Sequence, residues 1–110
     1  MEDETELELQ LYRQKIVIEL ERRLVALQDV EKRVSSAQFV FGQANQAVRT
    51  GNGSTARKQV EHAHRLKLRR ALGALEKERA EAKADLERAE ARLKEIDLRL
   101  DELLREREGV

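Results

Sequence analysis

Apolar residues recur every seven positions along most of the chain. One ladder contains Leu20, Leu27, Val34, Phe41 and Val48, and after a short interruption a second contains Leu68, Leu75, Ala82, Ala89, Ile96 and Leu103. A further ladder, offset by three or four residues, accompanies each of them, through Leu9, Ile16, Val30, Ala37 and Ala44 in the first half and Leu72, Leu86, Leu93 and Leu100 in the second. Two registers with this offset form the a and d seam of a coiled coil. The sequence therefore predicts two long helices that pack against each other.

The composition leaves little material for a core outside that seam. Of the 110 residues, 40% are charged, three are aromatic, and none is Pro, Cys or Trp. A multilayer core needs large apolar side chains from several elements, so we expect one elongated domain over residues 1–110. The absence of cysteine excludes disulfides, thiolate catalysis and structural zinc sites. The acidic first residues and the lack of a run of ~18 apolar residues favour a soluble, cytoplasmic protein.

The interruption predicts a turn. Gly51, Asn52 and Gly53 tolerate a positive φ and can end one helix, and Ser54 or Thr55 can accept backbone N–H groups at the start of the next. We therefore expect an all-α fold, an antiparallel coiled-coil hairpin with helices over residues 4–49 and 55–107 and a turn over 50–54.

Two glycines stand inside the expected helices. Gly42 and Gly73 each cost about 1 kcal/mol relative to Ala. They either permit two backbones to approach closely or merely soften the helices at those points.

The two ladders fit together in two plausible registers. In one, Arg23 lies opposite Arg79, a like-charge contact in a partly desolvated seam. In the other, Leu20 lies opposite Ala89 and large side chains face small ones, so we expect this register. The arginines at seam positions 13, 23, 65, 79 and 107 can lay their aliphatic part along leucines and turn the guanidinium outward, which favours a role in fixing the register over a role in binding.

A second apolar stripe runs along the first helix. Leu11, Ile18, Val25 and Phe39 lie at position f, which faces water in a two-stranded coil, and Lys32 interrupts the series. With the neighbouring e residues, the expected partner interface consists of Leu11, Val17, Ile18, Leu24, Val25 and Phe39. Soluble proteins rarely leave such a patch exposed, so we expect either self-association of two hairpins as a four-helix bundle, which needs no further component and is favoured, or a helix of another protein.

Charge is distributed unevenly although the net charge is zero. Residues 1–12 contain five acids and no base, whereas Glu61 is the lone acid in residues 49–70. Candidate contacts for an anion such as nucleic acid are Arg57, Lys58, Arg65, Lys67, Arg69 and Arg70. No aromatic residue lies among them to stack on bases, so a solvated basic end that helps hairpins associate with acidic ends is the favoured alternative.

Residues suited to catalysis or metal binding are sparse. His62 and His64 are two apart, which on a helix points them away from each other, and Gly51–Ser54 lacks the Lys-Ser/Thr of a phosphate-binding loop. The carboxylates follow the spacing of a solvated helix, without a cleft that would desolvate one of them. We therefore expect no enzyme activity, no cofactor and no metal.

The heptads and the polar turn resemble known families built on a bare helical hairpin. These are the small stalk proteins of flagellar and type III secretion export ATPases and the tRNA-binding arm of seryl-tRNA synthetase. The first resemblance implies a stalk-type regulator of an export ATPase, and the second a nucleic-acid-binding arm. Transcript-cleavage factors are also built on a helical hairpin, and their hairpin tip is acidic. A resemblance to them is excluded, because residues 49–60 contain no Asp or Glu. The residues themselves favour an interaction or scaffolding module.

Overall fold

The chain folds into two long helices. In a computed structural model, which describes residues 5–50 and 54–109, helix α1 covers Glu6–Thr50 and helix α2 covers Thr55–Glu108. Helices account for 97% of the described residues, and no strand occurs among them. The predicted all-α hairpin of two long helices is confirmed. The predicted start at residue 4 and the turn residues 51–53 lie outside the described residues.

Each helix begins with a side-chain cap. The hydroxyl of Thr5 accepts the backbone N–H of Glu8 at 3.1 Å, and the hydroxyl of Ser54 accepts that of Arg57 at 3.2 Å. These bonds satisfy N–H groups that have no partner within the first turn of a helix. Of the two residues predicted as candidates for the second cap, Ser54 and Thr55, Ser54 forms the bond, whereas the cap at Thr5 was not predicted.

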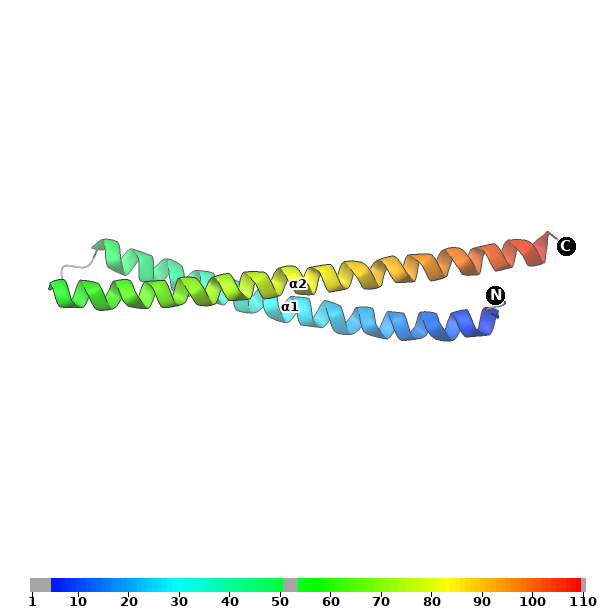
Figure 1. Cartoon of the computed structure of the whole chain (residues 1–110), viewed down its shortest axis with the longest axis horizontal. Coiled ribbons are helices and arrows are strands. Elements are labelled where there is room, and N and C mark those ends of the chain that lie inside the picture. The colour runs from blue at the N-terminus through cyan, green and yellow to red at the C-terminus, as the bar shows by residue number, and fades with distance from the viewer. Residues whose placement is uncertain (1–4, 51–53, 110) are drawn as a thin grey trace. The chain divides into compact units, whose positions relative to one another are not determined.

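Two compact units make up the chain. Unit 1 contains residues 1–26 and 83–110, and unit 2 contains residues 27–82. Each unit therefore combines one part of α1 with one part of α2 (Figure 1). In unit 1 the start of α1 lies beside the end of α2, where Arg107 is 2.5 Å from Glu6. The prediction of one elongated domain stays a prediction.

Burial follows the predicted seam in both units. The buried apolar residues of the described ranges are Leu9, Ile16 and Ala89 in unit 1 and Val30 and Val34 in unit 2. Most other apolar members of the ladders are half-buried, because a seam of two helices covers each side chain on one side only. The apolar ladders are thus confirmed as the line of contact between the helices.

Ion pairs across the seam agree with the favoured register. That register sets Arg13 opposite Ile96, and Arg13 binds the adjacent Asp97 at 2.6 Å. It sets Arg23 opposite Leu86, and Arg23 binds the adjacent Asp85 at 3.2 Å. Because residue numbers fall on α2 as they rise on α1, the helices of unit 1 are antiparallel.

The two glycines within the helices lie in open space. A Cβ atom added at Gly42 or Gly73 would have no atom within 4 Å among its non-local neighbours. Close approach of two backbones at these positions is therefore excluded. Of the two alternatives given above, local softening of the helix is the one left.

Candidate interaction surface

An apolar face of α1 is left uncovered in unit 1. We call this set of residues the outer face: Leu11, Val17, Ile18, Leu24 and Val25. The exposed fractions of Leu11, Ile18 and Val25 are 52%, 49% and 64%, and Val17 is half-buried at the edge of the seam. Residues seven apart lie on one side of a helix, so these side chains point to the side of α1 that α2 does not cover.

In unit 2, position f of α1 is occupied by Phe39 and, one heptad earlier, by Lys32. Phe39 is 67% exposed, and Val40 beside it is also exposed. Lys32, one heptad before Phe39, is exposed as well. The six residues predicted as a partner interface are thus all at least partly accessible, and their role as an interface stays a prediction.

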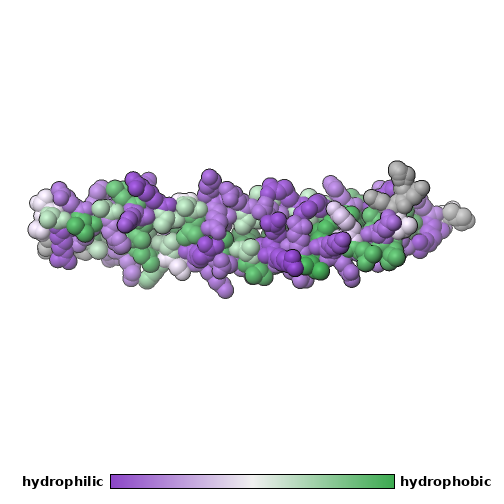
Figure 2. All heavy atoms as spheres, turned by 60° about the horizontal axis from the view of Figure 1, so that its bottom comes forward, coloured by the Kyte–Doolittle hydropathy of each residue, from purple (hydrophilic) through white to green (hydrophobic). Residues whose placement is uncertain are grey.

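Two shallow hollows border the outer face. The first is lined by Leu7, Gln10, Leu11, Arg13, Gln14 and Leu100, and the second by Lys15, Ile18, Glu19, Arg22, Arg23 and Ala26. Figure 2 shows hydrophobic residues reaching the surface between hydrophilic ones. Polar and basic side chains therefore flank the apolar residues of the outer face, a mixture that is typical of the rim of a protein interface.

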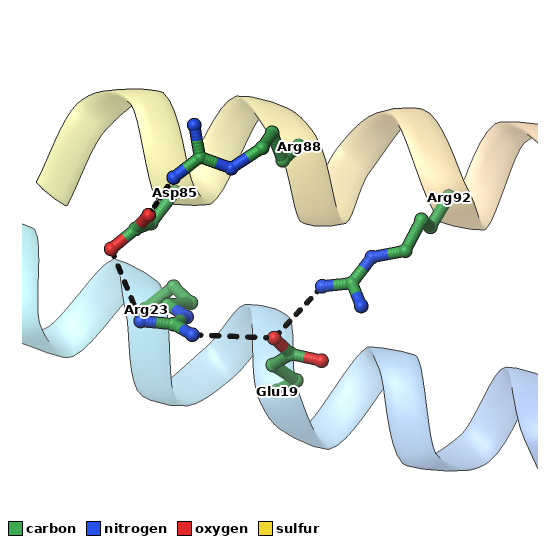
Figure 3. A network of polar contacts seen from close by, with 5 residues as sticks. All are labelled: Glu19, Arg23, Asp85, Arg88 and Arg92. Atoms are coloured by element: carbon green, nitrogen blue, oxygen red, sulfur yellow. Dashed lines mark hydrogen bonds and ion pairs between the residues drawn. The ribbon is translucent and has the colours of Figure 1, made fainter. Parts of the chain in front are cut away.

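An ion network joins the two helices on one flank of unit 1 (Figure 3). Arg92 of α2 lies 2.8 Å from a carboxylate oxygen of Glu19 on α1, and Arg23 bridges Glu19 and Asp85. Arg88 also binds Asp85. The pKa of Glu19 is lowered, chiefly by the hydrogen bond from Arg92. Glu19 is at heptad position g, whereas Val17 and Leu24 are at e on the other flank, so the apolar edge and the network do not coincide.

The seam arginines were predicted to fix the register, and three of them reach a carboxylate of the other helix. They are Arg13, Arg23 and Arg107, paired with Asp97, Asp85 and Glu6 respectively. The hydrogen bond from Arg13 to Asp97 and the charge of that carboxylate raise the pKa of Arg13. Sequence reasoning anticipated the outward guanidinium groups and missed their acidic partners.

The predicted basic residues lie in unit 2. Two of them have local partners, since Arg57 binds Glu61 at 3.2 Å and Arg65 approaches Nδ1 of His62 at 2.9 Å. The other four form no ion pair with any residue in the described ranges: Lys58, Lys67, Arg69 and Arg70. Unit 2 contains 11 Lys and Arg against 6 Asp and Glu, a formal charge of +5.

His62 and His64 are both exposed on α2. Within residues 5–50 and 54–109, no three His, Cys, Asp or Glu side chains are grouped so that they could hold a metal ion. Over the same ranges, neither helix has an apolar stretch that would reach across a membrane. Comparison with protein-family models, with curated proteins and with solved structures finds no match for this chain.

Proposed function

We propose that this chain is a non-enzymatic, cytoplasmic coiled-coil module for interaction or scaffolding, which dimerises or docks on a helical protein through the outer face of α1. The observation that carries the proposal is the exposure of Leu11, Ile18 and Val25 at successive heptad positions. Complete burial of a large aliphatic side chain contributes roughly 1.5 to 3 kcal/mol, so a contact on this face would be strongly favourable.

The small core supports the same proposal. Five apolar side chains are buried in the described parts of the chain, and most of the seam is only half-buried. A pair of helices with so thin a seam gains little to offset a backbone entropy cost of about 1 to 2 kcal/mol per residue. Packing of further helices on the outer face would convert the hairpin into a bundle with a two-sided core.

The test replaces two apolar residues of the outer face with Glu. It compares this variant with one that carries Glu at a similarly exposed apolar position on α2. In the double variant Ile18→Glu, Val25→Glu, we expect loss of concentration-dependent association in sedimentation velocity. The control variant is Leu98→Glu, since Leu98 is 62% exposed on α2. We expect the control to associate like the wild type. Association and partner capture by the double variant at wild-type levels would contradict the proposal.

A second candidate function is a nucleic-acid-binding arm, which is favoured by the four basic residues of unit 2 that lack an ion pair within the described ranges. Such groups release counterions when they bind phosphates, so the affinity falls steeply with salt. In electrophoretic shifts with RNA and DNA, the variant Lys67→Gln, Arg69→Gln, Arg70→Gln would bind more weakly than the wild type. The variant Ile18→Glu, Val25→Glu would bind like the wild type.

A third candidate, a stalk-type regulator of an export ATPase, is supported by the hairpin fold alone. It would require the purified chain to bind such an ATPase and change its rate of ATP hydrolysis.

A further inference from the structure

We propose that one flank of unit 2 binds the phosphate backbone of a nucleic-acid duplex without reading its base sequence. The inference rests on the second candidate function above and specifies its ligand and its site. The site lies within unit 2 and needs neither the outer face of α1 nor any residue of unit 1. We call it the basic flank, and it consists of Lys58, Arg65 and Arg69 of α2 with Ser35, Gln38 and Asn45 of α1.

An ion pair across the seam of unit 2 distinguishes its two flanks. Arg33 on α1 and Glu78 on α2 lie 3.1 Å apart, and both are at heptad position g. In an antiparallel pair of helices, residues at g face residues at g, and residues at e face residues at e on the opposite flank. Gln38 on α1 and Arg69 on α2 are both at e. They therefore lie on the flank opposite to the pair of Arg33 and Glu78.

Basic residues at seam positions reach the same flank. Arg65 is at position a, which adjoins e on the helix surface, and its guanidinium lies 2.9 Å from Nδ1 of His62 at e. Lys58 is one heptad before Arg65 and is exposed. Arg69 is exposed as well, and neither it nor Lys58 forms an ion pair with any residue in the described ranges. Three bases thus follow one line along α2, and at least two are accessible to an external anion.

Carboxylates are nearly absent from this part of unit 2. Residues 34–75 contain seven Lys and Arg and a single acid, Glu61. Arg57 at position g binds Glu61 at 3.2 Å, so this carboxylate is paired on the opposite flank. The nearest acids at position e are Glu31 and Glu76, which mark the inner end of the basic flank. The flank itself is therefore positive and has no carboxylate that would repel a phosphate.

Neutral hydrogen-bonding side chains complete the flank on α1. Ser35 and Gln38 are exposed, and Asn45 is half-buried. Side chains of these types commonly bind phosphate oxygens and sugars in complexes with nucleic acids. Gly42 is at position b, adjacent to e, and a Cβ there would meet no non-local atom within 4 Å. No side chain at this position obstructs the approach of a bulky backbone.

The density of charge on the ligand decides between the possible anions. The line from Lys58 to Arg69 extends over about 16 Å of α2. A duplex carries one negative charge per ~1.7 Å of its axis and condenses counterions, which basic side chains release on binding. Carboxylates on an acidic protein surface are spaced more widely and hold fewer such counterions, so the same bases gain less from them. The basic flank is therefore better matched to a nucleic acid than to an acidic protein.

The positions of the aromatic residues favour a duplex over a single strand. Single strands are bound largely by stacking of bases on aromatic side chains. Tyr12 belongs to unit 1, Phe39 is at position f of α1, and Phe41 is at seam position a. None of them is on the basic flank. Contacts to phosphates and sugars remain, and these carry no direct information about sequence.

Fluorescence anisotropy with the complete chain tests the ligand. The probes are two labelled duplexes of equal length and unrelated sequence, and the single strands from which they are made. We expect equal affinities for the duplexes, with dissociation constants of roughly 10⁻⁴ to 10⁻⁶ M, and weaker binding of the single strands. The logarithm of the association constant should fall with the logarithm of the salt concentration with a slope of about −3, since three bases contact phosphates. Tighter binding of single strands, or equal binding of poly-glutamate, would overturn the duplex as ligand.

Two variants with the same loss of charge test the site. Lys58→Gln, Arg69→Gln removes two bases of the flank and is expected to weaken duplex binding roughly tenfold and to bring the salt slope to about −1. The control is Lys67→Gln, Arg70→Gln, since Lys67 and Arg70 are exposed at positions c and f, away from the flank. We expect the control to lose less than about threefold in affinity. Equal losses in the two variants would overturn the flank as the site.

A second matched pair tests the contribution of α1. Gln38→Glu places a carboxylate on the basic flank and is expected to weaken duplex binding roughly threefold or more through repulsion of the phosphates. Gln43→Glu makes the same change at exposed position c and should leave the affinity near that of the wild type. Circular dichroism checks that both variants keep their α-helix content. Unchanged affinity in Gln38→Glu would exclude α1 from the site.

The outcomes separate this inference from the proposed functions. If both double variants lose affinity equally, the chain still binds nucleic acid, but not through the basic flank. If the wild-type chain binds no duplex even at low salt, the second candidate function and this inference are both wrong. Neither result affects the proposal for the outer face, which Ile18→Glu, Val25→Glu tests independently.

Discussion

The guanidinium of Arg13 on α1 lies 2.6 Å from the carboxylate of Asp97 on α2, beside the apolar seam of unit 1. The pair joins two residues far apart in the sequence, so it forms only when the helices fold back in the observed register. Both side chains are nearly half exposed, with 43% and 47% of their surface accessible. Solvent therefore screens the attraction. We expect Asp97→Asn to lower the thermal unfolding midpoint slightly, as measured by circular dichroism. A loss as large as that from a buried seam residue would contradict this expectation.

Acid should weaken the network around Glu19. Its pKa is lowered in the folded state, chiefly by the hydrogen bond from Arg92, so the stabilisation is present above the ordinary pKa near 4.5 and is lost as the pH falls through the lower folded value. We expect Glu19→Gln to be less stable than the wild type near pH 7 and equally stable at strongly acidic pH. Thermal melts of both proteins over that range measure the difference. A difference in stability that persists at acidic pH would show that Glu19→Gln acts by disturbing the packing and not by removing the charge.

Truncation inside the seam should be costly. Val34 is 1% exposed, so Val34→Ala leaves a cavity and is expected to reduce the free energy of unfolding by about 1 to 3 kcal/mol. Val25→Ala is the matched control, because Val25 is 64% exposed and should lose less than about 0.5 kcal/mol in the monomer. Urea unfolding at low protein concentration gives both values. Equal losses would be inconsistent with the seam described above.

Alanine should stabilise the helices at their two internal glycines. A Cβ atom at Gly42 or Gly73 meets no obstacle, so each substitution is expected to add about 0.5 to 1 kcal/mol by raising helix propensity. Gly109→Ala is the control, since its Cβ would lie 3.2 Å from the carbonyl oxygen of Arg105 and should bring no gain. Urea unfolding again measures the change, and destabilisation at position 42 or 73 would indicate an unseen contact there.

The seam could be predicted from sequence because burial of apolar residues dominates the packing of two helices. The repeat through Val30 and Val34 identified residues that are buried in the structure. The register was chosen because it avoids a contact of Arg23 with Arg79 and sets large side chains opposite small ones, as in Leu20 opposite Ala89. The seam and the size argument depend on short apolar side chains, whose positions follow directly from the backbone.

The polar contacts were harder to predict, because long side chains reach several partners. The link from Glu19 to Arg92 was missed, although the chosen register places the two residues near each other. The cap at Thr5 was also missed, although Thr5 and Glu8 have the spacing of a capping box. The partner of the outer face could not be predicted from the sequence. The identity of exposed residues such as Ile18 shows that a contact would be apolar, but it does not distinguish one apolar partner from another.

Ala89 has no accessible surface, and the favoured register sets it opposite Leu20 of α1. Any larger side chain there would have to push the helices apart. Through evolution, position 89 should therefore accept only small residues in every descendant that retains the hairpin. Positions 18 and 25 should remain apolar only in lineages that retain the binding partner. Natural variation at these three sites would thus separate selection for folding from selection for binding.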